Sequence, residues 1–137
     1  MYKKIIVPVD LAHADKLDKA LATAADLAKH YGAELCCVGV TAAAPSAVAH
    51  NPKEFGERLE AFAKDCGARH GVTMTARTVE SHDPARDVDE ALDKAVHAEG
   101  ADLVVMASHV PTFADHIFAS RAGWLASHTD TSVFVVR

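Results

Sequence analysis

The sequence predicts a three-layer α/β sandwich in which helices cover both faces of a five-stranded parallel sheet. Short apolar segments rich in β-branched residues alternate with segments of amphipathic helical periodicity. Half of the 137 residues are apolar, which is enough for a buried core without disulfides or a structural metal. Strands joined through helices form right-handed crossovers, so the sheet is parallel. We therefore expect one domain over residues 1–137.

The first part of the chain predicts two buried strands and the helix between them. Residues 4–10 form a β-branched run that ends in an acid, as expected of a central strand covered on both faces. Residues 15–31 repeat apolar side chains at three- and four-residue steps, and Gly32 follows as a stop signal. A second strand spans residues 35–40. The small-residue stretch 42–51 is interpreted as a mobile connection.

The rest of the chain continues the alternation of helix and strand. Apolar periodicity, glycine stop signals and a helix-opening proline set the boundaries. The expected elements are a helix over 55–66 that closes between Gly67 and Gly71, a strand over 72–80, a helix from Pro84 to residue 96, a strand over 101–108, a helix over 120–128 and a strand over 132–137.

Five strands in so short a chain are typical of a flavodoxin-like or nucleotide-binding sandwich. In open parallel sheets the ligand lies outside the carboxyl ends of the strands, at the point where the strand order reverses. We therefore expect a binding site near Asp10, Val40 and the loop after Met106.

Charge and hydropathy argue against partners that need a basic surface or a membrane. The net charge is −5 and no cluster of lysine and arginine is present, so neither nucleic acid nor an anionic membrane surface is an expected partner. The longest apolar runs are far shorter than the ~20 residues that cross a bilayer. No signal-peptide cleavage pattern follows the first residues, so we expect a cytoplasmic protein.

The titratable side chains form no recognised metal or catalytic pattern. Nine histidines are present, but none forms a His-x-x-x-His pair and no Cys-x-x-Cys pair accompanies them, so no metal site is expected. Ser108 and His109 are adjacent, and adjacent strand residues point to opposite faces, which argues against a nucleophile and base. The adjacent Cys36 and Cys37 lie in an apolar strand, where we expect buried, inert thiols.

Three segments together resemble the universal stress protein family. They are the opening KKIIVPVD, the strand and loop ADLVVMASHVP and the closing SHTDTSVFVVR. With the elements between them the resemblance covers essentially the whole chain, and the loop ASH-x-P is similar to the shorter-looped subgroup. The resemblance implies the strand order 3-2-1-4-5 of the adenine nucleotide alpha hydrolase-like fold. It also implies a homodimer in which the last strands pair across a two-fold axis, and a regulatory protein partner.

The resemblance also implies a site for ATP or AMP. Many members bind ATP through Gly-x-x-Gly, a spacer, and then Gly-Ser or Gly-Thr. At the glycine positions this chain carries Ala107, Val110 and Ala119, whereas Ser120 matches. The family pattern places Asp10 beside the nucleoside. The nucleotide-binding residues that the resemblance implies are Pro8, Val9, Asp10, Val40, Ala107, Ser108, His109, Val110, Ala119, Ser120 and Arg121.

Each of the main site residues also has an ordinary structural interpretation. Asp10 suits a cap or turn before residues 11–14. Ser120 suits the N-cap of the last helix, and this role can coexist with phosphate binding. Val40 would lie beside adenine through its backbone, and simple strand packing is equally consistent with its position.

The leading hypothesis is a dimeric regulatory or protective protein whose pocket binds an adenine nucleotide weakly or not at all. It would act through its conformation and its partners rather than by turnover. The family implies a slow nucleotide-dependent ATP hydrolase as one alternative. A flavodoxin-like redox module is the other, although the chain lacks a glycine-rich, aromatic-lined flavin loop.

The substituted loop generates a prediction about ATP affinity. Val110 is β-branched, so it cannot easily reach φ > 0 or let the backbone approach a phosphate. Wherever the loop needs φ > 0 to bind ATP, each glycine replaced by another residue costs ~1 kcal/mol of binding free energy. Replacing Val110 and Ala119 together by glycine should tighten ATP binding clearly, and Ser120→Ala should remove most of the native binding. Calorimetric titration with and without magnesium measures both effects. Micromolar ATP binding that the glycine substitutions leave unchanged would contradict this prediction.

Overall fold

The computed structural model describes residues 1–42, 45, 48–82, 84–107 and 123–137, with side chains except those of 84–88. Residues 123–128 are helical. The other elements are β1 (Lys4–Pro8), the 3-10 helix η1 (Leu11–Leu17), α1 (Asp18–Tyr31), β2 (Glu34–Thr41), α2 (Pro52–His70), β3 (Met74–Glu80), α3 (Pro84–Ala98), β4 (Leu103–Ala107) and β5 (Ser132–Val136).

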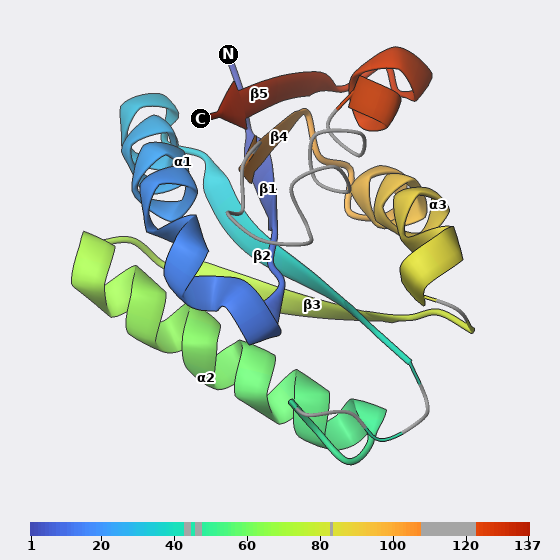
Figure 1. Ribbon diagram of the computed structural model, residues 1–137. Coiled ribbons are helices and arrows are strands. Elements are labelled where there is room, and N and C mark those ends of the chain that lie inside the picture. The colour runs from blue at the N-terminus through green and yellow to red at the C-terminus, as the bar shows by residue number, and fades with distance from the viewer. Residues whose placement is uncertain (43–44, 46–47, 83, 108–122) are drawn as a thin grey trace.

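The strands form one parallel sheet in the order β3-β2-β1-β4-β5, which confirms the expected order. Figure 1 shows α1 and α2 on one face of the sheet and α3 with the helix of residues 123–128 on the other. The predicted three-layer α/β sandwich is therefore confirmed. None of the described helices is long and apolar enough to span a membrane.

The first strand lies at the centre of both hydrophobic layers. Ile5 and Val7 belong to the cluster beneath α1 and α2, whereas Ile6 belongs to the cluster beneath α3. Ile5 and Ile6 are both 0% exposed. Successive residues of a strand point to opposite faces, so this continuous apolar run seals the two layers at once.

Two helices differ in their bounds from those that the sequence predicts. The helix expected from residue 15 begins as α1 at Asp18, and the separate 3-10 helix η1, with a non-helical His13, precedes it. The helix expected over 55–66 is the longer α2, because Asn51 caps its start and Gly71, at φ 68°, ends it.

Gly67 and the connection after β2 also differ from their expected roles. Gly67 lies inside α2, where an added Cβ would come within 2.6 Å of the Val72 carbonyl oxygen. This glycine therefore allows a close backbone approach and does not end the helix. In the connection expected over 42–51, Ala49 is buried in the core. Residues 43–44 and 46–47 of that connection lie outside the described part.

Asp102 joins the amino ends of β1 and β4. Its two carboxylate oxygens accept hydrogen bonds from the backbone N–H groups of Lys3 (2.9 Å) and Lys4 (3.0 Å). In return the Asp102 N–H donates to the Lys4 carbonyl oxygen at 3.1 Å. Partial burial acts to raise the pKa of Asp102, but the two backbone N–H groups outweigh it and hold this pKa below its usual value. The ionised carboxylate thus fastens two strands that are distant in the sequence.

The contact between β2 and α2 generates a stability prediction. A Cβ at Gly39 would lie 2.8 Å from Cε1 of Phe55 and 3.1 Å from Cδ2 of Leu59, and both side chains are buried. Gly39→Ala should therefore lower the free energy of unfolding by about 1–3 kcal/mol through overpacking. Urea denaturation measures this change.

The matched control for this prediction is Gly56→Ala. Gly56 lies inside α2, and its added Cβ would meet only the Thr78 hydroxyl oxygen at an ordinary 3.4 Å. This substitution should leave stability unchanged or raise it by up to about 1 kcal/mol, because alanine favours a helix over glycine. Equal stabilities of the two variants would show that the β2–α2 contact is not tightly packed.

Candidate functional site

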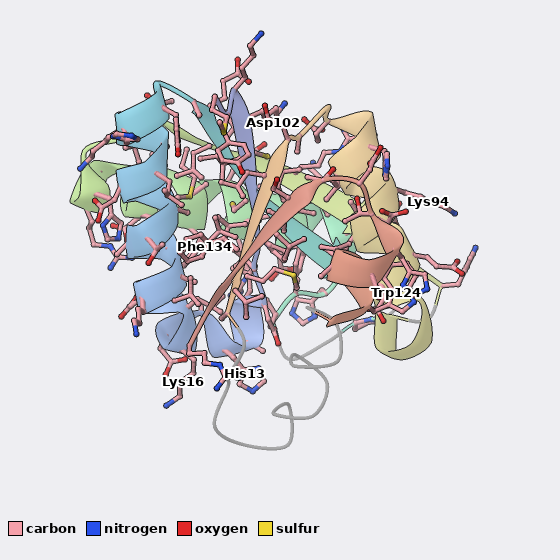
Figure 2. The ribbon with its side chains drawn as sticks, turned by 90° about the horizontal axis from the view of Figure 1, so that it is seen from above. His13, Lys16, Lys94, Asp102, Trp124 and Phe134 are labelled. Carbon is pink, nitrogen blue, oxygen red and sulfur yellow. The ribbon has the colours of Figure 1, made fainter. Side chains whose placement is uncertain are left out.

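The strand order reverses between β1 and β4. The chain runs outward through β1, β2 and β3, and then crosses back to place β4 on the other side of β1. A crevice outside the carboxyl ends of the strands at such a point is the usual ligand site of an open parallel sheet. Figure 2 shows Asp102 at one end of the central strands and His13 at the other, so the site lies at the end opposite the Asp102 bonds.

Pro8 stands where the hydrogen-bonded ladder between β1 and β4 stops. Val9 donates its N–H to the Val38 carbonyl of β2, whereas the Lys4 carbonyl accepts from Asp102 on the β4 side. Because alternate residues of a parallel strand bond to opposite neighbours, the position of Pro8 directs its nitrogen at β4. Proline has no N–H, so it cannot extend that ladder.

The register pairs agree with this role of Pro8. In the described part of the chain, β1 pairs with β2 as far as Pro8 and Val38, but with β4 only through Ile5–Leu103 and Ile6–Val104. The register pairs between β1 and β4 therefore end earlier along β1 than those between β1 and β2. The crevice expected at a reversal of strand order lies outside these carboxyl ends.

Asp10 follows β1 at the rim of this crevice. Its Oδ1 accepts a hydrogen bond from the Ala12 N–H at 3.1 Å and caps η1, while its Oδ2 lies 3.0 Å from Nδ1 of His13. The cap interpretation from the sequence is thus confirmed. The Asp10 side chain remains 37% exposed and the His13 side chain 43% exposed. The carboxylate and imidazole therefore face solvent as one polar pair.

Sequence reasoning missed His13. The signal was present in Asp10-x-x-His13, because an acid that caps a tight turn is followed three residues later by a side chain on the same side of that turn. The apolar periodicity of the following helix gave no indication of η1. His13 was therefore counted only among the chain's histidines.

The structure places five of the predicted nucleotide-binding residues. Pro8 ends β1, Val9 and Asp10 follow it, and Ala107 ends the neighbouring strand β4. Val9 and Ala107 are buried on the α1 and α2 side of the sheet, whereas Val40 packs against the α3 cluster. Ser108, His109, Val110, Ala119, Ser120 and Arg121, with the loop that they belong to, lie outside the described residues.

The cysteines are buried, as the sequence predicts. Cys36, Cys37 and Cys66 are at most 3% exposed. Burial raises the pKa of Cys37 to about 12, and it also raises the pKa of Cys36 and Cys66. These thiols stay protonated near neutral pH. Among the described residues, no group of three or more histidine, cysteine or acidic side chains is placed to hold a metal ion.

Comparison with known proteins identifies the family. The universal stress protein family matches the chain over residues 1–137. The chain belongs to the universal stress protein family. Universal stress protein G of Shigella flexneri is 28% identical, and the alignment covers all of both chains.

Solved universal stress proteins share this fold. One in complex with cAMP has a TM-score of 0.71 and 20% identity, over 99% of this chain and 97% of the other. The protein from Archaeoglobus fulgidus in complex with dAMP has a TM-score of 0.67 and 15% identity, over 99% of this chain and 98% of the other. Each of these two structures contains an adenine nucleotide with a single phosphate. At this level of sequence identity, their similarity to this chain is a similarity of fold.

Proposed function

We propose that this universal stress protein is a dimeric regulatory or protective protein whose β1–β4 crevice binds an adenine nucleotide weakly. The observation that carries the proposal is the reversal of strand order between β1 and β4, with the partly exposed Asp10 carboxylate just after the carboxyl end of β1. The nucleotide-bound protein acts through its conformation and through a regulatory protein partner. It does not act by turning the nucleotide over.

Asp10 is the acceptor for the sugar of the nucleotide. Each of its oxygens already has one neighbour, the Ala12 N–H and the His13 ring, but a carboxylate offers about four acceptor positions. A ribose hydroxyl can therefore bond to Asp10 without breaking the cap of η1. The complexes of family members with cAMP and dAMP support the assignment of an adenine nucleotide to this crevice.

The sequence of the loop supports weak rather than tight phosphate binding. Alanine or valine replaces glycine at three positions of the family's phosphate loop, at Ala107, Val110 and Ala119. The β- and γ-phosphates of ATP therefore gain little over the single phosphate of AMP, because backbone N–H groups must approach closely to bind them. We propose that AMP and ATP bind with similar affinities, without a structural metal.

The Asp10 assignment is tested by Asp10→Asn. Asparagine caps a helix about as well as aspartate, so η1 should remain folded while the charged acceptor is lost. A hydrogen bond to a charged group contributes about 1.5–3 kcal/mol, so AMP affinity should fall by roughly tenfold or more. Calorimetric titration with AMP, cAMP and ATP measures this loss.

Asp15→Asn is the matched control for Asp10→Asn. Asp15 lies on the same 3-10 helix, and its side chain is 75% exposed. Its substitution should leave nucleotide affinity unchanged. If the native protein binds none of the three nucleotides at millimolar concentration, the crevice is not a nucleotide site. If Asp10→Asn binds as the native protein does, the crevice binds nucleotide without this carboxylate.

The dimer in this proposal forms through β5. This strand lies at the edge of the sheet, where its outer backbone groups are available for pairing, and Phe134 and Val135 are 45% and 42% exposed. An apolar edge strand of this kind is an aggregation hazard unless another chain covers it. A two-fold pairing of β5 with its copy covers the apolar side chains of both chains.

Val135→Lys tests the dimer. A charge on the pairing strand should shift the protein from dimer to monomer at micromolar concentration, because two copies would bring like charges together. Size-exclusion chromatography with light scattering measures the mass. Thr75→Lys, on the exposed side of the opposite edge strand β3, should leave the dimer intact. A monomeric native protein, or equal dissociation of the two variants, would rule out pairing through β5.

A further inference from the structure

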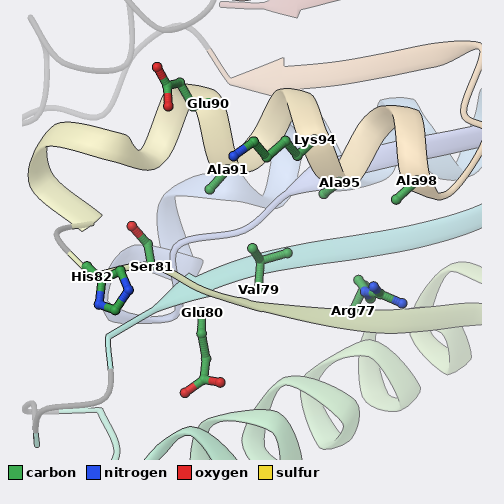
Figure 3. Close-up of a pocket in the computed structure, with 10 residues that line it drawn as sticks. All are labelled: Arg77, Val79, Glu80, Ser81, His82, Glu90, Ala91, Lys94, Ala95 and Ala98. Atoms are coloured by element: carbon green, nitrogen blue, oxygen red, sulfur yellow. The ribbon is translucent and has the colours of Figure 1, made fainter.

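A separate groove lies between the edge strand β3 and helix α3. It has a volume of about 370 Å³, which is within the range of sites for small organic molecules. Figure 3 shows Val79 pointing from β3 toward α3, and Ala91, Ala95 and Ala98 pointing from α3 toward β3. The alanines recur at four- and three-residue steps, so they form one face of the helix. Their short side chains leave the space between helix and strand unfilled.

The polar lining of this groove consists of the cations Arg77 and Lys94, the acids Glu80 and Glu90, and the side chains of Ser81 and His82. Lys94 lies along α3 beside Ala91, and the Ser81 hydroxyl points from the carboxyl end of β3 toward the helix. Arg77 lies at the other end, near Ala98. The carboxylates of Glu80 and Glu90 also belong to the lining, but in Figure 3 they point away from the space between strand and helix.

The two cations differ in how far they are already neutralised. Nη1 of Arg77 lies 3.1 Å from a carboxylate oxygen of Glu99, and the other oxygen of Glu99 lies 2.8 Å from Nζ of Lys4. The hydrogen bond from Lys4 lowers the pKa of Glu99 against the opposing effect of burial, so Glu99 remains ionised and holds Arg77. None of the ion pairs among the described residues involves Lys94. Lys94 is therefore the charge available to a ligand.

We propose that the groove between β3 and α3 binds a carboxylate carried on an apolar chain or ring. The ammonium of Lys94 and the hydroxyl of Ser81 supply donors for the two carboxylate oxygens. The apolar body lies between Val79 and the alanine face of α3, where it removes exposed apolar surface from water. Arg77 is held by Glu99 at the far end, so Lys94 is the charge that selects an anionic over a cationic ligand.

The chemistry of the groove favours a carboxylate over a phosphate group. A bound phosphate ester carries more negative charge and three free oxygens, and protein sites usually satisfy these with arginine forks or with several backbone N–H groups. Here one lysine that joins none of the ion pairs of the described residues, and one hydroxyl, are next to an apolar wall of four side chains. The groove also differs in place from the nucleotide crevice, because β2 separates β3 from β1 in the sheet.

The proposal is tested by titrating the full chain with octanoate, below its micelle concentration, in two-dimensional ¹H–¹⁵N NMR. Saturable shifts should appear in β3 and α3, with a dissociation constant at or below about 1 mM. Octylammonium should bind at least about fivefold more weakly, because its charge repels the Lys94 ammonium. Saturating AMP should leave octanoate binding unchanged.

Two variants with matched controls locate the site. Lys94→Gln should weaken octanoate binding at least about fivefold through loss of the charged donor. Ala91→Leu should abolish binding by filling the groove. Lys64→Gln and Ala68→Leu make the same changes on exposed positions of α2, beyond the opposite face of the sheet, and should have no effect.

Several results would overturn the proposal. These are an absence of saturation up to about 10 mM octanoate, shifts centred on the exposed apolar residues of β5, an unchanged affinity of Lys94→Gln, or displacement of octanoate by AMP. Displacement would show that octanoate occupies the nucleotide crevice. Folded Ala91→Leu protein that binds octanoate normally would show that the ligand lies elsewhere.

Discussion

The reversal of strand order on either side of β1 is the constraint on which the arrangement of the site depends. β1 lies between β2 and β4, and the helices α1 and α3 that lead into these two strands cover opposite faces of the sheet (Figure 1). Val9 keeps β1 bonded to β2 beyond Pro8, whereas Pro8 has no N–H to donate toward β4. At the other end Asp102 fastens β1 to β4. The two strands are thus fastened at the end opposite the expected site, and Asp10 follows β1 at the site end.

The fold could be predicted from the sequence because its signals are local. Apolar runs, helical periodicity and glycine stops depend only on neighbouring residues, and the family resemblance supplied the strand order. The position of Asp10 was predictable for the same reason, since it directly ends the first apolar run. The effect of Pro8 was not, because it depends on which neighbour each backbone N–H faces, and only the assembled sheet decides that. The cap signal Asn51-Pro52 is also local, and it places the start of α2 earlier than apolar periodicity alone does.

Small residues act in opposite ways on the two faces of the sheet. On the α2 side, Gly39 has no side chain, so the ring of Phe55 packs directly against strand β2 and fills the contact. On the α3 side, three alanines face β3, and Val79 is the apolar side chain that the strand directs at them. Small residues are thus present in both contacts, but the β2–α2 contact is densely packed and the β3–α3 contact is hollow. The helices cause the difference, because α2 presents an aromatic ring and a leucine to the sheet, whereas α3 presents methyl groups.

The Asp102 bonds also bear on how the protein is made. They join residues 98 and 99 positions apart, so the central strand meets its second neighbour only after most of the chain has been synthesised. At ribosomal rates of about 5–20 residues per second, roughly 5–20 s separate the two strands. During that interval Ile5, Ile6 and Val7, all fully buried in the finished protein, lack half of their cover. The nascent chain therefore carries an incompletely covered apolar strand for seconds before β4 has been made.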